Sequence, residues 1–270
     1  MPASPLSRPD VWNAVAAGYA DDLVPLFSLY AADALRLAGL PDGARVLDVA
    51  AGPGTLAFLA ADRGADVVAL DFADAMVAAL RQRAAREGVT AVEAVRGDGQ
   101  ALPFDDGTFD RAFSMFGLIF FPDPGAGLRE AHRVLRPGGR MTVSSWAPLD
   151  GVPLLQTCFG AIREHLPDLP FGDGAAPFGQ PEALSEAFEA AGFRDVEVHT
   201  VAHRIEATSA ASFWASSERS SAPLALLRGH LDADAWGALR SEVVETIERE
   251  LGDGPYPMEW PARIAVGTRP

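Results

Sequence analysis

The chain has 270 residues, a formal net charge of −15 at pH 7 and 49% hydrophobic residues. This hydrophobic content supplies a core and excludes wholesale disorder. Every basic residue is an arginine, and the acidic balance argues against nucleic acid as a partner, because phosphate binding needs clustered basic side chains. We expect one domain over residues 1–270.

Cysteine content and apolar runs narrow the class of protein further. Cys158 is the only cysteine, so an internal disulfide and a multi-cysteine metal site are excluded, and no metal is expected. No apolar run reaches the ~18 residues of a membrane span, and residues 1–10 lack the apolar core of a signal peptide. We expect a cytoplasmic protein with no membrane partner. The oligomeric state stays open, with a homodimer as one alternative.

The first half of the chain alternates between helical and strand patterns, which predicts a parallel, doubly wound sheet. The expected elements are helices over 11–30 (interrupted near Pro25) and 31–39, a strand over 45–49, a helix over 56–61, a strand over 66–70, a helix over 73–87, strands over 90–95 and 109–114, a helix over 127–135, and a strand over 140–145.

Beyond Trp146 the pattern becomes mostly helical. The expected elements are helices over 153–166 and 181–191, a sixth strand over 196–206, a helical segment over 209–251 with interruptions around Pro223 and Asp232, and a final strand over 262–267.

A glycine turn directly follows the first predicted strand, Arg45 to Val49. Gly52 and Gly54 let the backbone turn sharply and approach a ligand closely, because neither has a Cβ. A strand, a glycine turn and a helix N-terminus together indicate a nucleotide site at the carboxyl edge of a parallel sheet. A dinucleotide fingerprint fits poorly, because Ala57 stands where its third glycine belongs.

Four sequence motifs then fall in order. They are Asp48 with Gly52 and Gly54, Asp71 after the second strand, Gly97-Asp98-Gly99 before 101–104, and Leu135-Arg136-Pro137-Gly138-Gly139. Over residues 45–145 this set resembles the class I S-adenosylmethionine (SAM) methyltransferases of the ubiquinone/menaquinone-biosynthesis type. The resemblance implies a Rossmann-like seven-stranded sheet with its last strand antiparallel, helices on both faces and SAM as cofactor, with S-adenosylhomocysteine (SAH) as product. Ala50 departs from the family pattern, which has glycine there.

The resemblance also implies a set of cofactor-binding residues. Asp71 would accept both ribose hydroxyls, Asp98 the adenine amino hydrogens, and Asp48 would orient the loop or meet the methionine ammonium. Ser114 would offer its backbone to that ammonium, and Tyr19 would cover the methionine end. The full set is Tyr19, Asp48, Ala50, Gly52, Asp71, Phe72, Met76, Asp98, Gly99, Gln100 and Ser114, with Leu102 placed to sandwich the adenine against Phe72.

Methyl transfer needs alignment of its reactants more than side-chain chemistry. A base is needed only if the acceptor must first lose a proton. His165 is the candidate base, because it shares a helical face with Leu154, Cys158 and Ile162. In proteins of this layout a helix after the fifth strand borders the acceptor pocket.

We expect a SAM-binding core over about 31–146, 181–207 and 258–270, and a mostly helical lid from segments 1–30, 147–180 and 208–257. The lid segments are rich in large apolar residues, which are Trp12, Leu26, Phe27, Tyr30, Leu154, Leu155, Phe159, Phe171, Phe178, Phe213, Trp214 and Trp236. Ligand pockets are mostly apolar with few polar anchors. The predicted acceptor is therefore a small, largely hydrophobic molecule, such as an aromatic or polyketide-like metabolite or a quinone precursor, as in secondary metabolism.

Three alternatives stay open beside in-line methyl transfer. The first is a SAM-binding enzyme that uses the bound sulfonium for a non-methylating reaction such as cyclisation. The second is a nicotinamide-dependent oxidoreductase, which Ala57 and the Gly97-Asp98-Gly99 site disfavour. The third is a protein or RNA methyltransferase, which the acidic balance disfavours.

Overall fold

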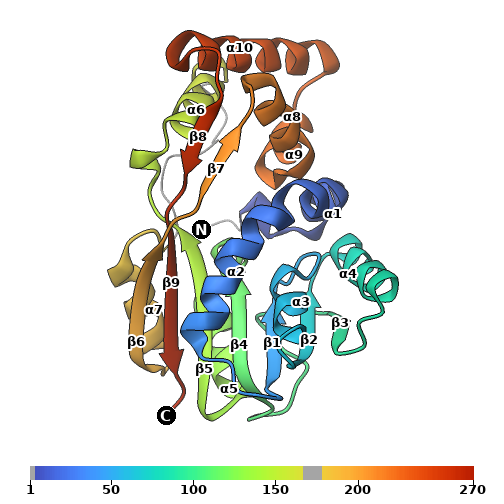
Figure 1. Cartoon of the computed structure of the whole chain (residues 1–270), viewed down its shortest axis with the longest axis vertical. Helices are drawn as coiled ribbons and strands as arrows, with labels where there is room; N and C mark the ends of the chain where they lie inside the picture. The colour runs from blue at the N-terminus through green and yellow to red at the C-terminus, as the bar shows by residue number, and fades with distance from the viewer. Residues whose placement is uncertain (1–3, 167–177) are drawn as a thin grey trace.

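A seven-stranded sheet forms the centre of the computed structural model, which describes residues 4–166 and 178–270 (Figure 1). The strands run in the order β3-β2-β1-β4-β5-β9-β6. Their bounds are β1 Arg45–Val49, β2 Asp66–Asp71, β3 Val92–Arg96, β4 Phe109–Met115, β5 Leu135–Trp146, β6 Arg194–Val201 and β9 Ala262–Thr268. Strand β9 pairs antiparallel with both β5 and β6, and the other strand pairs of this sheet are parallel. The predicted fold class, with its antiparallel last strand, is confirmed.

Helices cover both faces of this sheet (Figure 1). The α-helices of the described ranges, including those that lie beyond the sheet, are α1 Pro9–Gly18, α2 Val24–Ala38, α3 Thr55–Ala61, α4 Asp74–Glu87, α5 Pro124–Val134, α6 Pro153–His165, α7 Pro181–Ala190, α8 Ala210–Ser220, α9 Ala222–Arg228 and α10 Ala233–Leu251. The interruption expected near Pro25 is a π-helical turn, Tyr19–Leu23, between α1 and α2. Pro25 itself lies in the first turn of α2, where its missing N–H costs no hydrogen bond.

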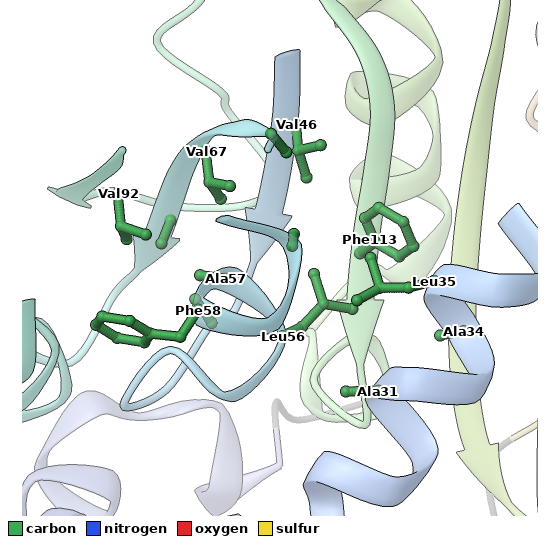
Figure 2. Packing of buried hydrophobic residues seen from close by; sticks show 14 of the residues in the cluster. Ala31, Ala34, Leu35, Val46, Leu56, Ala57, Phe58, Val67, Val92 and Phe113 are labelled. Carbon is green, nitrogen blue, oxygen red and sulfur yellow. The ribbon is translucent and has the colours of Figure 1, made fainter. Parts of the chain in front are cut away.

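Strand β1 shows how the sheet separates two hydrophobic clusters, because successive side chains of a strand point to opposite faces. Val46 packs with α2 and α3 residues such as Leu35 and Leu56, as Figure 2 shows. Leu47 and Val49 belong to the cluster of the other face, which contains residues of α5 and α7. Both faces of this parallel sheet are therefore buried, as such sheets require.

The predicted sixth strand over 196–206 is wrong as a single element. The chain leaves the main sheet after Val201, and a separate strand β7, Arg204–Ala207, pairs antiparallel with β8, Tyr256–Glu259, in a two-stranded sheet. Sequence alternation does not reveal which partner a strand takes, so the two strands read as one. His203 lies between β6 and β7, and its Nε2 is 2.8 Å from Asp33 Oδ2 of α2.

A further hydrophobic cluster, called the upper cluster below, lies beyond the carboxyl ends of β1, β4 and β5, in the upper half of Figure 1. It is built from α6, α8, α9, α10 and β8, and it includes Leu155, Trp214, Leu239 and Met258. Part of the predicted lid segment 147–180, with Phe171, lies outside the described residues. Among the helices of the described ranges, none is both long and apolar enough to cross a membrane.

The N-terminal helix is joined to this upper cluster at one close crossing. A Cβ added to Gly18 would overlap the backbone carbonyl oxygen of Arg219 in α8 and lie 2.7 Å from its carbonyl carbon. Beside the crossing, the Arg219 guanidinium contacts both carboxylate oxygens of Asp22, at 3.1 and 2.9 Å. The two helices therefore approach backbone to backbone, and Gly18 is the residue that permits it.

We expect Gly18→Ala to lower the free energy of unfolding by about 1–3 kcal/mol, the usual cost of forcing extra volume into a packed contact. Gly237→Ala is the matched control, because Gly237 is exposed in α10 and an added Cβ would meet nothing within 4 Å. The control should gain about 0.5–1 kcal/mol, because glycine is a poor helix former. Urea unfolding measures both, and equal stability of the two variants would disprove the close crossing.

Candidate active site

A cavity of 1190 Å³ lies at the carboxyl ends of the strands and is called the large cavity below. Its cofactor half is lined by residues that follow β1, β2 and β3, including Gly52, Asp71 and Gly99. Its acceptor half is lined by residues of α6, α8, α9 and β8, including Leu155 and Met258. One continuous space thus joins the sheet edge to the upper cluster.

The turn after β1 is held in a left-handed conformation by a buried carboxylate. Ala50, Gly52 and Gly54 have φ angles of 56°, 56° and 86°. The Gly52 N–H donates to Asp71 Oδ2 at 2.8 Å, and the Ala73 N–H donates to Asp71 Oδ1 at 2.9 Å. Asp71 therefore ties the end of β2 to the glycine turn and to the start of α4.

Asp48 and Asp71 are two buried carboxyl groups near the carboxyl ends of the adjacent strands β1 and β2, where Asp48 lies opposite Ala69, two residues before Asp71. Burial raises the pKa of Asp48 to about 8, and the charge of Asp71 adds to this rise. Burial also raises the pKa of Asp71 to about 6, against the hydrogen bonds from Ala73 and Gly52. Asp48 Oδ2 is buried with no hydrogen-bond partner among the described residues. This end of the site favours a ligand that brings positive charge or hydrogen-bond donors.

Ala50 stands where the family pattern has glycine, and its left-handed backbone conformation costs about 1–2 kcal/mol for an alanine. The structure shows what accommodates its methyl group. A Cβ added to Gly117, just after β4, would overlap the Ala50 Cβ. Gly117 therefore leaves the space that the Ala50 methyl group occupies, and the two residues form a complementary pair.

The structure brings most of the predicted cofactor residues together. Those that line the large cavity are Tyr19, Ala50, Gly52, Asp71, Phe72, Met76, Asp98, Gly99 and Gln100. Asp48 lines an adjoining small cavity of 30 Å³, together with Tyr19 and Thr55. Burial of Tyr19 and the nearby Asp71 and Asp48 raise the pKa of its hydroxyl, which stays protonated. The binding roles themselves stay predictions.

Ser114 and Leu102 are not among the described residues that line the two cavities. The Ser114 side chain is fully buried, and its Oγ has no hydrogen-bond partner in the described part of the chain. Its neighbour Met115 lines both cavities instead. Leu102 is buried in the hydrophobic cluster that contains Leu47 and Val49. Phe121 lines the large cavity instead, and its ring lies beside Gly99.

The turn after β3 is ordered by its own side chains. Asp98 Oδ1 accepts from the Gln100 N–H at 2.8 Å, and Gln100 Oε1 accepts from the Asp123 N–H at 2.9 Å. A Cβ on Gly99 would lie 2.6 Å from the Phe121 ring and 2.7 Å from Val49. The exposed Asp98 carboxylate keeps lone pairs for a ligand, and Gly99 keeps the backbone close to the sheet.

The structure places the predicted base His165 at the exposed end of α6. Leu154, Cys158 and Ile162 are buried, but His165 is exposed at the last turn of α6 and is absent from the described lining of the large cavity. Arg163 of the same last turn lines the large cavity, and the role of His165 as a base stays a prediction. Of the five histidines, all in the described ranges, His230 lines this cavity.

Sequence reasoning missed a stack of three aromatic rings along the cavity wall. Phe116, Trp146 and Trp260 line the large cavity and stack on one another. Trp146 ends β5, so its place at the carboxyl edge could have been inferred from the predicted strand. Trp260 follows β8, which the sequence did not reveal, and it carried no signal of its own.

Comparison with known proteins agrees with this geometry. Residues 46–139 match a family model described as a methyltransferase domain. A nocamycin O-methyltransferase of Saccharothrix syringae is 30% identical over 256 residues, which cover 87% of this chain and 89% of that protein. The chain belongs to the SAM-dependent methyltransferases. This family membership makes SAM its cofactor.

Two further relatives match shorter parts of the chain. A demethylmenaquinone methyltransferase of Thermus thermophilus is 37% identical over 171 residues, 55% of this methyltransferase and 74% of that one. A Mycobacterium tuberculosis protein of uncharacterized function is 43% identical over 109 residues, 40% of this chain and 39% of that protein. The chain thus spans well under half the length of that relative.

Solved structures share the fold of this methyltransferase. A proposed methyltransferase of Bacillus halodurans superposes with a TM-score of 0.61 at 22% identity, covering 89% of this chain and 98% of that one. The cyclase SpnF superposes with a TM-score of 0.54 at 21% identity, covering 89% and 80%. The same fold therefore occurs with more than one chemistry.

We expect Asp71→Asn to weaken SAH binding roughly 10–100-fold, through loss of charge-assisted hydrogen bonds to the ribose. The amide oxygen can still accept one of the two backbone N–H groups, so the turn should remain folded. Asp66→Asn, at the exposed opposite end of the same strand, is the control and should bind SAH normally. Calorimetry that shows unchanged affinity for Asp71→Asn would remove this residue from the site.

We also expect SAH affinity to increase as the pH is raised from 6 to 8. If the ligand favours ionised Asp48, a proton must leave below the pKa of about 8. Affinity then falls by about tenfold for each pH unit below that pKa. Calorimetry across this range measures the slope, and Asp48→Asn should flatten it. A flat or falling affinity in the unsubstituted protein would show that Asp48 does not ionise on binding.

Proposed function

We propose that this protein transfers a methyl group from SAM to a small, largely hydrophobic molecule by in-line displacement. The observation that supports it most directly is the continuous large cavity, which joins the Asp71 end to the apolar acceptor half. A cofactor held at the first end would point its reacting group into a space lined mainly by apolar side chains.

The residues of the cofactor half suit SAM. Asp71 presents a buried carboxylate for ribose hydroxyls, and the exposed Asp98, which lines the large cavity after β3, presents a second carboxylate for the adenine amino group. The unpartnered Asp48 Oδ2 beside the small cavity suits the methionine ammonium, directly or through a water. Tyr19 lies against this end, because a Cβ on Gly52 would be 3.9 Å from its ring.

The acceptor half favours a hydrophobic substrate. Leu155, Phe159, Phe213, Leu227 and Met258 line it. Among the described lining residues Arg163 is the one arginine, and the chain has no lysine. A polyanionic acceptor such as a nucleotide would lack the clustered cations that it needs.

The protein's contribution to the reaction is mainly alignment and exclusion of water. When bound, SAM supplies a methyl group on a sulfonium, which is a good leaving group. Holding an acceptor atom in line can contribute roughly 7–11 kcal/mol to lowering the barrier. We assign proton acceptance from the acceptor to His230 rather than His165, because His230 lines the large cavity.

Oxygen is the acceptor atom that we favour. The nocamycin O-methyltransferase matches this chain through the acceptor half as well as the sheet, over 87% of its length. The same match favours methyl transfer over a non-methylating use of the sulfonium, for which the cyclase SpnF offers similarity of fold alone.

The test is a methyl-transfer screen with methyl-labelled SAM and two acceptor panels. One panel holds hydrophobic ring compounds with a hydroxyl group, and the other holds nucleotides, sugar phosphates and peptides. We expect label to enter the first panel. Label confined to the second would contradict the proposed acceptor class, and SAH binding without any label transfer would favour the non-methylating reaction.

Variants of the two histidines are then assayed for methyl transfer to an acceptor found in that screen. His230→Gln should lower kcat by about tenfold or more, because it removes a proton acceptor near the substrate. His165→Gln is the matched control and should keep the unsubstituted rate. The reverse pattern would restore His165 as the base.

A further inference from the structure

A row of five aromatic rings runs along one wall of the large cavity. We define the aromatic row as Tyr19, Phe27, Phe116, Trp146 and Trp260. Neighbouring ring centroids lie 5.5, 5.1, 4.0 and 3.9 Å apart in that order. Tyr19 lies against the Gly52 turn, so the row begins at the cofactor half and ends at Trp260.

The row is held rigidly from behind by Tyr30. This fully buried ring meets Phe116 and Trp146 edge-on, at interplanar angles of 88° and 87°. Its hydroxyl donates to the Trp260 backbone carbonyl at 2.6 Å. The Phe116 N–H donates to Ser144 Oγ at 2.9 Å, which fixes the left-handed Phe116 at a φ of 57°. A preorganised wall binds a ligand with little loss of side-chain entropy.

Trp260 differs from the other stacked rings of the row. Trp146 is covered on both faces, by Phe116 with an interplanar angle of 18° and by Trp260 with one of 16°. In the part of the chain that the structure describes, the Trp260 ring pairs with Trp146 alone. Trp260 is half-buried, lines the large cavity, and has Met258 as an apolar neighbour there. One face of its indole therefore carries no stacked ring in the described structure, in a residue that lines the large cavity.

The large cavity has room for an acceptor beside this face of Trp260. At 1190 Å³ it exceeds the roughly 300–1,000 Å³ of a typical pocket for one drug-sized ligand. Space therefore remains for an extended acceptor once the cofactor half is filled. Flat rings gain from offset stacking on an indole beyond the area that they bury.

We propose that Trp260 is the specificity-determining residue of the acceptor half, and that it stacks on a flat, conjugated ring system of an extended acceptor. This inference rests on the proposed function, because it names the acceptor class of the same site. Binding energy from a ring remote from the reacting atom would then help to hold that atom in line.

The experiment titrates the SAH-loaded protein with 2-naphthol and with decahydro-2-naphthol. The two probes share a carbon skeleton and a hydroxyl group, and differ in planarity. Calorimetry gives the affinities, and the indole N–H signals of the five tryptophans show by NMR where each probe binds. Trp260→Phe identifies the Trp260 signal by its loss. Neither Trp260→Phe nor Trp260→Leu removes the hydrogen bond from Tyr30, because its acceptor is the backbone carbonyl of residue 260.

We expect 2-naphthol to shift the Trp260 signal and Trp260→Leu to weaken its binding about two- to tenfold, the range for an aromatic pair. Trp260→Phe should retain most of that affinity, and decahydro-2-naphthol should bind both variants as it binds the unsubstituted protein. Trp214→Phe is the matched control with no expected effect. Trp214 is buried in α8 outside the described lining, and its Nε1 has no partner among the described residues.

An unmoved Trp260 signal, or equal losses for both probes in Trp260→Leu, would overturn the inference. Failure of the proposed function gives a different result. In that case 2-naphthol would still shift Trp260 in the SAH-loaded protein, and the label screen would show no transfer.

Discussion

Two carboxyl groups at the ends of adjacent strands are the constraint on which this site depends. Asp48 and Asp71 are both buried in a protein of net charge −15, so leaving both ionised without a partner is costly. Asp71 reduces this cost by accepting from Gly52 and Ala73. Asp48 keeps an oxygen without a partner in the described structure. Asp71 thus holds the glycine turn, and the two buried carboxyl groups together favour a ligand that brings positive charge or hydrogen-bond donors.

The acceptor half is positioned by contacts that reach back to this turn. Gly18 lets α1 meet α8 backbone to backbone, and the Asp22–Arg219 pair lies beside that crossing. Tyr19 is the next residue along the chain and lies against the Gly52 turn. The π-helical turn that holds Tyr19 therefore connects the cofactor half to the helices that surround the acceptor.

Much of the sheet could be predicted because its signals are local. The strand at 45–49, the glycine turn and Asp71 each depend on neighbours in sequence, and the structure places them as expected. The prediction of the sixth strand was wrong because β6 and β7 share one alternating pattern but pair with two different strands, β9 and β8, which come much later in the chain. Periodicity placed His165 on one helical face with Cys158, but it does not show where a helix ends, and His165 is exposed in the last turn of α6. Trp260 had no local signal, since its place depends on β8 and on the ring of Trp146.

The structural strain of the site gathers where the strand order reverses. The chain runs outward from β1 through β2 to β3 and then crosses to β4 on the other side of β1, and ligands of open α/β sheets bind at such a switch point. Ala50 follows β1 and Phe116 follows β4, and both adopt left-handed φ angles that non-glycine residues seldom take. The Ala50 methyl group sits in the space that Gly117 leaves, while Phe116 stacks on Trp146. One pair of strained residues thus connects the turn at the cofactor half to the aromatic row of the acceptor half, as expected where backbone strain is kept for function.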